Sequence, residues 1–113
     1  MSVQPATLWR VDRRRTFEAL RQARLRRVGP ITVSWVAGDP AEPRRVAFAI
    51  GRRVGSAVVR NRLRRRLRML LREAAPQLSP GAYLIGASAS ATLLSYDELR
   101  DNLMRALELA CRQ

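Results

Sequence analysis

The clearest pattern in the chain is a change of hydrophobic period near its middle. Val46, Phe48 and Ile50 alternate with small alanines, and this period of two predicts a strand over 45–50. A break rich in glycine and arginine follows. Ser56 then stands where a helix N-cap is expected, and the apolar positions beyond it recur at helical spacing.

The predicted helix carries two different surfaces and ends near Pro76, because the residue before a proline avoids the helical conformation. On a wheel that turns by about 100° per residue, one side is apolar: Val59, Leu63, Leu67, Leu70 and Ala74, with Leu71 at its border. The opposite side is polar: Asn61, Arg64, Arg65, Arg68 and Arg72. We therefore expect one face of this helix in the core and a wide cationic face outside.

This cationic face lacks the acidic residues that a solvated helix surface normally contains. No acid occurs between Glu42 and Glu73, while arginines at positions 60, 64, 68 and 72 follow one another at a spacing of four. Like charges at that spacing repel, whereas alternating charges would attract. The pattern favours an external polyanion over a merely solvated face.

The N-terminal part predicts one helix. Residues 1–11 are expected to be poorly ordered, with Trp9 as a packing cover over that helix in preference to a base-stacking residue. Asp12 is expected to cap the helix, which runs to about Ala23 with a narrow stripe at (i, i+3) spacing: Phe17, Leu20 and Ala23.

The remaining elements follow from alternation, turns and capping signals. Strands are predicted over 31–35 and 82–87, and the loop over 38–43 has the length of a hairpin between the strands 31–35 and 45–50. Ser95 and Glu98 form a capping box at the start of a last helix. Its expected core positions are Leu99, Leu103, Ala106, Leu107 and Ala110.

The resulting order, α-β-β-α-β-α, predicts one α/β domain over 1–113, a two-layer sandwich in which helices pack on a central sheet. The net charge of +13 points to nucleic acid first and to an anionic membrane second. All 22 basic residues are arginine, which binds phosphate through two hydrogen bonds and stacks on bases.

Several functional classes lack the residues they need. One cysteine and no histidine cannot build a zinc site or an internal disulfide. No apolar run is long enough to span a membrane and no signal peptide is evident, so a cytoplasmic protein is expected. Asp97, Glu98 and Asp101 do cluster, but capping and a solvated helix face explain them. A catalytic site made by the protein itself is therefore disfavoured.

The motif over residues 55–68, Gly-Ser-Ala-Val-Val-Arg-Asn-Arg-Leu-Arg-Arg-Arg-Leu-Arg, resembles the signature of the bacterial ribonuclease P protein subunits. The similarity extends from about Asp12 to about Leu107. The resemblance implies the same element order, with a left-handed β-α-β crossover around the basic helix, although right-handed crossovers are the rule.

The resemblance also implies a function. The chain would bind the catalytic RNA and precursor tRNA, and would assist that RNA in removing the 5′ leader. Mg²⁺ would be held chiefly by the RNA, and the protein would bind no cofactor tightly. No DNA, membrane or obligate protein partner is implied.

Two sets of site residues follow by matching positions. Contacts with the RNA subunit and the substrate junction are implied for Arg52, Arg53, Arg60, Asn61, Arg62 and Arg65. A cleft for the single-stranded leader is implied at Phe17, Val33, Trp35, Arg64 and Arg68. Aromatic residues beside arginines suit single-stranded RNA, but plain burial in the core is an equal alternative for Phe17 and Val33.

This sequence departs from the family pattern at a few positions. Trp35 replaces a smaller aromatic residue, Ser56 replaces asparagine or glycine, and Arg52 and Arg53 replace lysines. Two other functions compete. A structural RNA-binding protein of the ribosomal type would explain the charge but not an aromatic cleft. A membrane-surface or calmodulin-binding helix is disfavoured by the flanking strands.

Overall fold

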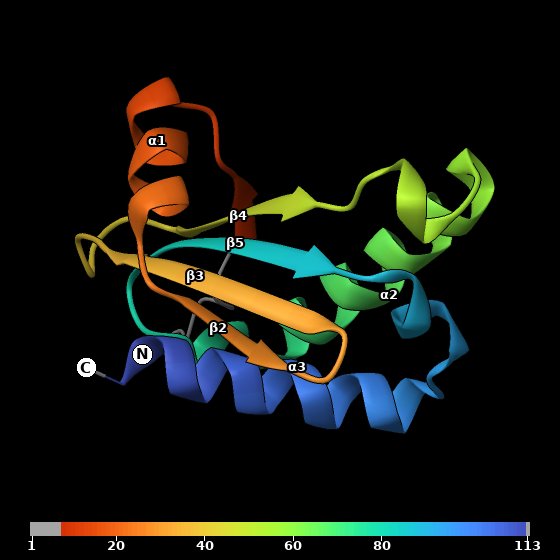
Figure 1. Cartoon of the computed structure of the whole chain (residues 1–113). Coiled ribbons are helices and arrows are strands. Elements are labelled where there is room, and N and C mark those ends of the chain that lie inside the picture. Colours follow the sequence, from red (N-terminus) through yellow and green to blue (C-terminus); the bar gives the residue numbers. More distant parts are fainter. Residues whose placement is uncertain (1–7, 113) are drawn as a thin grey trace.

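A mixed sheet forms the centre of the structure, a computed structural model that describes residues 8–112 (Figure 1). Its strands are β1 (Leu8–Arg10), β2 (Leu25–Val28), β3 (Ile31–Ala37), β4 (Arg44–Ala49) and β5 (Gly81–Ala87). They lie in the order β1-β4-β5-β3-β2. The central strand β5 runs parallel to β4 and antiparallel to β3.

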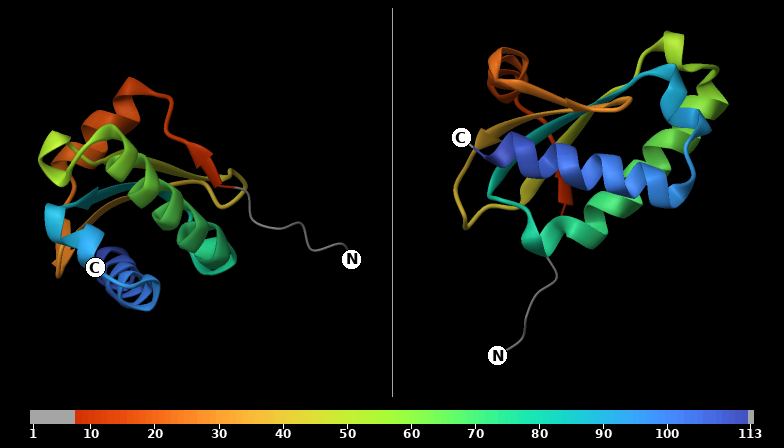
Figure 2. Two further views of the ribbon diagram at one scale, coloured as in Figure 1. Left: turned by 90° about the vertical axis from the view of Figure 1, so that its right-hand side faces the viewer. Right: turned by 60° about the horizontal axis from the view of Figure 1, so that its bottom comes forward.

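The helices flank this sheet on both faces. They are α1 (Arg14–Gln22), α2 (Ala57–Ala74) and α3 (Tyr96–Cys111). Helices α2 and α3 cover one face together, and the shorter α1 lies on the other (Figure 2). The predicted α/β fold is confirmed, and α2 is the connection between the parallel neighbours β4 and β5.

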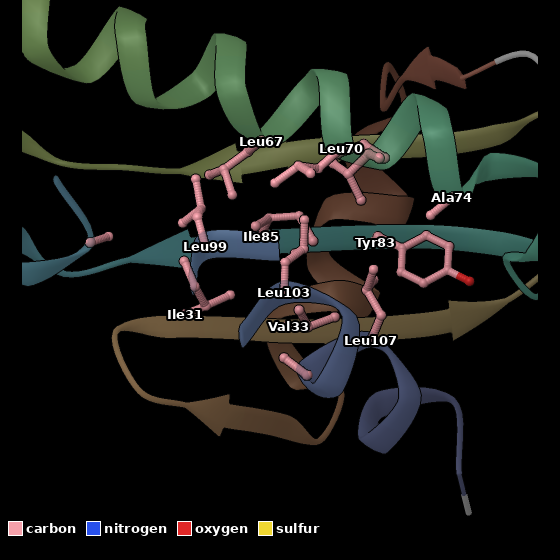
Figure 3. Packing of buried hydrophobic residues seen from close by; sticks show 14 of the residues in the cluster. Ile31, Val33, Leu67, Leu70, Ala74, Tyr83, Ile85, Leu99, Leu103 and Leu107 are labelled. Carbon is pink, nitrogen blue, oxygen red and sulfur yellow. The ribbon is translucent and has the colours of Figure 1, made fainter. Parts of the chain in front are cut away.

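The main core lies between the sheet and the α2–α3 layer. In Figure 3, Leu67 of α2 and Leu103 of α3 point toward Val33 and Ile85 of the sheet, and all four side chains are fully buried. The apolar face predicted for α2 is confirmed for its buried members: Leu63, Leu67, Leu70, Leu71 and Ala74. All the core positions predicted for the last helix are buried as well.

A smaller core lies on the opposite face, under α1. Leu20 of α1 is fully buried there, against Val11, Ala47 and Ala82. The two alanines come from adjacent strands, and their small side chains allow the helix to approach the sheet closely. Alternation along β4 therefore serves both layers, because Val46 packs in the main core while Ala47 contacts the α1 side.

The helix caps agree with the sequence in two of three cases. The Ser56 hydroxyl accepts a hydrogen bond from the Val59 backbone N–H at 3.3 Å, as predicted for α2. The predicted capping box at α3 is also confirmed. The prediction that Asp12 caps α1 is wrong: Arg13 occupies the N-cap position without a side-chain bond, and the Asp12 carboxylate lies 3.6 Å from Arg45 instead.

The two edge strands were not predicted. The prediction that residues 1–11 are poorly ordered is wrong for residues 8–11, because β1 pairs with β4 and Val11 is buried. Residues 1–7 lie outside the described residues. Strand β2 pairs with β3 across a turn at Gly29 and Pro30. Both strands are short. Strand β1 pairs with a strand far along the chain, and two arginines in β2 interrupt its apolar pattern.

The predicted hairpin between β3 and β4 is wrong, because β5 lies between them. The loop after β3 crosses the start of β5, where the Gly38 N–H donates to the Pro80 carbonyl at 3.1 Å. A Cβ on Gly81 would lie 2.0 Å from the Val36 carbonyl oxygen, so only glycine fits this crossing. Loop length had indicated a hairpin, but it carries no information on whether another strand will insert.

Shortening a side chain at the α2–sheet contact tests the main core. Leu67→Ala should lower the free energy of unfolding by about 2–5 kcal/mol, because it leaves a cavity where Leu67 is fully buried. Urea denaturation measures the change. The control is Leu93→Ala, since Leu93 is 83% exposed and its loss should stay within about 0.5 kcal/mol. If Leu67→Ala lowered the free energy of unfolding as little as Leu93→Ala does, the packing of Leu67 against the sheet would be contradicted.

The capping box of α3 should make stability depend on pH. The Ser95 backbone N–H donates to the Glu98 carboxylate at 2.9 Å, and this bond, with that of the Ser95 side chain, lowers the pKa of Glu98. Because the pKa of Glu98 is lower in the folded chain than in the unfolded chain, where it is about 4.3, the ionised carboxylate stabilises the fold at pH values above this unfolded value. This stabilisation is lost as the pH falls through the pKa of the folded chain. When the free energy of unfolding is measured at a series of acidic pH values, Glu98→Gln should lack the part of the pH dependence that comes from Glu98. Asp101→Asn, which leaves the box intact, should retain it; identical profiles for Glu98→Gln and the unmodified chain would refute the prediction.

Candidate nucleic-acid interface

Helix α2 holds a dense cationic surface against the core. Its leucines fix the helix on the sheet, so the arginines are directed outward and toward both flanks. Among residues 8–112, no arginine of α2 has an acidic group within 4.0 Å. The surface predicted from the missing acids is therefore present, with no internal counter-charge to neutralise it.

The residues implied to contact the RNA subunit lie at the N-terminal half of α2 and just before it. Arg52 and Arg53 are exposed on a short 3₁₀ helix, Arg52–Val54, which leads into α2. Asn61, Arg62 and Arg65 are exposed on the first turns of the helix. The structure thus brings this set onto one region of the surface.

Two members of this region have specific surroundings. The Asn61 side-chain oxygen accepts a hydrogen bond from Arg64 at 2.7 Å, which orients both side chains along the helix. Arg60 is half-buried, and its Nε is buried without a hydrogen-bond partner in the described part of the chain. A buried donor in this state costs free energy, which an acceptor oxygen from a ligand would recover.

A pocket of about 520 Å³ lies beside this surface, between α1 and α2 at the β1–β4 edge of the sheet. Phe17 of α1 forms part of one wall and is 38% exposed. Phe48 of β4 contributes a second ring, and the Arg68 guanidinium lies 5.5 Å from its centroid. The remaining lining residues include Leu8, Trp9, Arg10, Val11, Val46, Ala47, Arg64 and Arg72.

The pocket unites only part of the predicted cleft. Phe17, Arg64 and Arg68 line it together, whereas Val33 and Trp35 do not. Val33 is fully buried in the main core, and Trp35 packs against that core from the adjacent position on the same strand face. Their expected proximity to Arg68 fails because β5 lies between β3 and β4, which keeps β3 away from this flank of α2.

Only Phe17, Arg64 and Arg68 of the lining residues were predicted as site residues; Phe48, Arg72 and Trp9 are among those that were not. Phe48 was assigned to a strand but not to a site, although its alternation with Ala47 placed it on the α2 side. Arg72 belongs to the row of arginines at a spacing of four, which offered a direct signal. Trp9 was expected to cover α1 but lines the pocket from β1 instead.

The chemical groups at the pocket are aromatic rings and guanidinium groups. Among the described residues that line the pocket, none is acidic. Within residues 8–112, no three His, Cys, Asp or Glu side chains come together to form a metal site. No helix of the described chain combines the length and apolar character needed to cross a membrane. The pocket instead offers aromatic rings for stacking and guanidinium groups for phosphates, the requirements of single-stranded nucleic acid binding.

Comparisons with known proteins identify the family of this chain. The family model described as Ribonuclease P matches residues 6–111. A ribonuclease P protein component of Thermus scotoductus is 42% identical over 94 residues, which cover 83% of this chain and 55% of that protein. One from a Synechococcus species is 44% identical over 108 residues, with 89% and 80% covered. The chain spans about half the length of the Thermus relatives that it matches.

Solved structures show the same fold at lower sequence identity. The RNase P protein of Staphylococcus aureus has a TM-score of 0.80 at 15% identity, over 91% of this chain and 95% of that one. The RNase P protein of Thermotoga maritima has a TM-score of 0.76 at 18% identity, over 88% and 97%. Since the family model matches nearly the whole chain and the Synechococcus relative is matched over most of its own length, this chain belongs to the ribonuclease P protein family.

Proposed function

We propose that this chain is the RNA-binding protein subunit of a ribonuclease P ribonucleoprotein and assists a catalytic RNA in removing the 5′ leader of precursor tRNA. The observation that carries the proposal is the position of the pocket. It joins aromatic rings to arginines on one flank of α2, next to the arginine and asparagine residues of the family motif. Membership of the family supplies the reaction in which such a surface would act.

The N-terminal half of α2 and the pocket bind different segments of RNA in this proposal. The exposed N-terminal half of α2, with Arg52 and Arg53, binds phosphates of the RNA subunit near the substrate junction. The pocket receives the leader, whose unpaired bases can stack on Phe17 and Phe48 while Arg64 and Arg68 meet its phosphates. Because the leader is single-stranded and mature tRNA lacks it, only the precursor gains these contacts.

Bond cleavage is assigned to the RNA in this proposal. The RNA subunit would hold Mg²⁺, which supplies an activated water and stabilises charge on the phosphate. The contribution of the protein would be to position the precursor and to reduce phosphate repulsion between two RNAs. Neutralising phosphates in this way lowers the concentration of cations that the assembly needs.

The first test reconstitutes the enzyme. The purified chain alone should leave precursor tRNA intact, and it should accelerate leader removal when a bacterial RNase P RNA is added at low Mg²⁺, because its arginines replace part of the cation requirement. Gel electrophoresis of 5′-labelled precursor measures both. Leader removal by nuclease-free protein without RNA, or no acceleration at any Mg²⁺ concentration, would reject the proposal.

A second test separates the two surfaces with single variants. Arg65→Ala should weaken assembly with the RNA subunit. It should also reduce the slope of log affinity against log salt concentration by about one unit or less, because one phosphate contact is lost. Arg68→Ala should weaken precursor binding to the assembled enzyme by about tenfold, the value of one charge-assisted contact. It should leave mature tRNA binding unchanged.

The matched control is Arg105→Ala, which removes an exposed arginine from α3, away from the pocket. Filter binding over a range of salt concentrations measures all three variants. If Arg105→Ala changed precursor binding as much as Arg68→Ala does, net charge and not the pocket would explain the loss.

A further inference from the structure

The most exposed aromatic side chain near the pocket is Trp9, on the edge strand β1. Trp9 lies opposite Arg45 in the parallel pairing of β1 with β4. It is 52% exposed and belongs to neither core cluster, although its neighbour Leu8 packs against the main core. Trp9 therefore leaves a large aromatic surface accessible at one wall of the pocket.

A fixed cation holds the indole in place. The Arg45 guanidinium lies 5.2 Å from the centroid of the Trp9 ring, a cation–π distance. Arg45 is itself anchored: its Nη1 donates to the Arg10 carbonyl at 3.0 Å and lies 3.6 Å from the Asp12 carboxylate. Its side chain is only 23% exposed. The ring is therefore supported on one side by a group that cannot easily move away.

Trp9 shares the pocket with the rings of Phe17 and Phe48 and with the arginines of α2. Within residues 8–112, β1 is an edge of the sheet, and its outer backbone N–H and C=O groups have no neighbouring strand there. Stacking surface, positive charge and free hydrogen-bonding groups thus meet at one end of the pocket. An unpaired nucleotide requires this combination, because it presents an aromatic face, a phosphate and polar base edges.

We propose that Trp9, supported by Arg45, is a stacking platform for one unpaired nucleobase at the β1 end of the pocket. The inference rests on the proposed function, and it adds a binding position that the family motif does not contain. The ligand is a single-stranded RNA segment that lies on Phe17 and Phe48 and continues past β1. Each stacked base contributes about tenfold to a hundredfold in affinity.

The chain offers its own spectroscopic probe. It contains two tryptophans, and Trp35→Phe leaves Trp9 as the only one. The Trp35 Nε1 has no hydrogen-bond partner in the described structure, so phenylalanine removes no bond there. A short unstructured RNA, five uridines with a fluorescent label, is titrated into Trp35→Phe at low salt. Label anisotropy reports binding, while indole emission reports stacking on Trp9.

Binding should quench the Trp9 emission, and Trp9→Ala should weaken binding by about tenfold or more, while Trp9→Phe retains most of it. The matched control is Leu25→Ala: Leu25 is 53% exposed on β2, at the opposite edge of the sheet, and its loss should leave affinity unchanged. Circular dichroism confirms folding, and the quenching experiment tests the platform even if Trp9→Ala does not fold.

Arg68→Ala and Phe17→Ala in the same titration separate the two proposals. If they weaken binding while Trp9→Ala does not, or if bound RNA leaves the Trp9 emission unchanged, the platform is overturned and the pocket stands. If none of these variants changes the affinity, or if the RNA does not bind at all, the pocket assignment fails together with the platform.

Discussion

The burial of one leucine stripe makes the rest of this structure possible. Arginines four residues apart on α2 repel each other, at a cost of a few tenths of a kcal/mol per pair, and no acid on the helix relieves them before Glu73. Burying one leucine contributes about 1.5–3 kcal/mol, and Leu63, Leu67, Leu70 and Leu71 are all buried. Packing therefore outweighs the repulsion. The helix can keep a cationic surface that would be unfavourable without this anchor.

The central position of β5 decides what that cationic surface faces. Because β5 separates β4 from β3, the flank of α2 that carries Arg64 and Arg68 meets β4 and the edge strand β1. The aromatic residues of β4 and α1 then become part of the pocket, while Trp35, the aromatic residue of β3, packs against the main core. The close crossing at Gly38 and Gly81 allows this insertion, since a side chain on Gly81 would collide with the β3 backbone.

Arginine and aromatic rings are paired at several points of this small protein. Arg68 lies over Phe48, and both residues line the pocket; Arg45 lies over Trp9, which lines the same pocket. In each pair the cation is held near an apolar surface that is still accessible to a ligand. Such pairs combine stacking with phosphate neutralisation, so they suit a flexible RNA strand without requiring a particular base.

The sequence by itself determined the elements whose signals are local. The helical period of α2, the caps at Ser56 and Ser95 and the cationic surface of α2 all depend on residues within a few positions of each other, so they were predicted correctly. The resemblance over residues 55–68 further indicated the family, which the comparisons confirm.

Only the tertiary structure decided how these elements meet. Strand neighbours depend on pairing between distant segments, and neither loop length nor alternation specifies which strand inserts between two others. For this reason the hairpin after β3 was predicted wrongly and β1 was missed. The same non-local choice determined which aromatic side chains line the pocket. It buried Val33, separated Trp35 from Arg68, and placed Trp9 at the wall of the pocket that arginines of α2 also line.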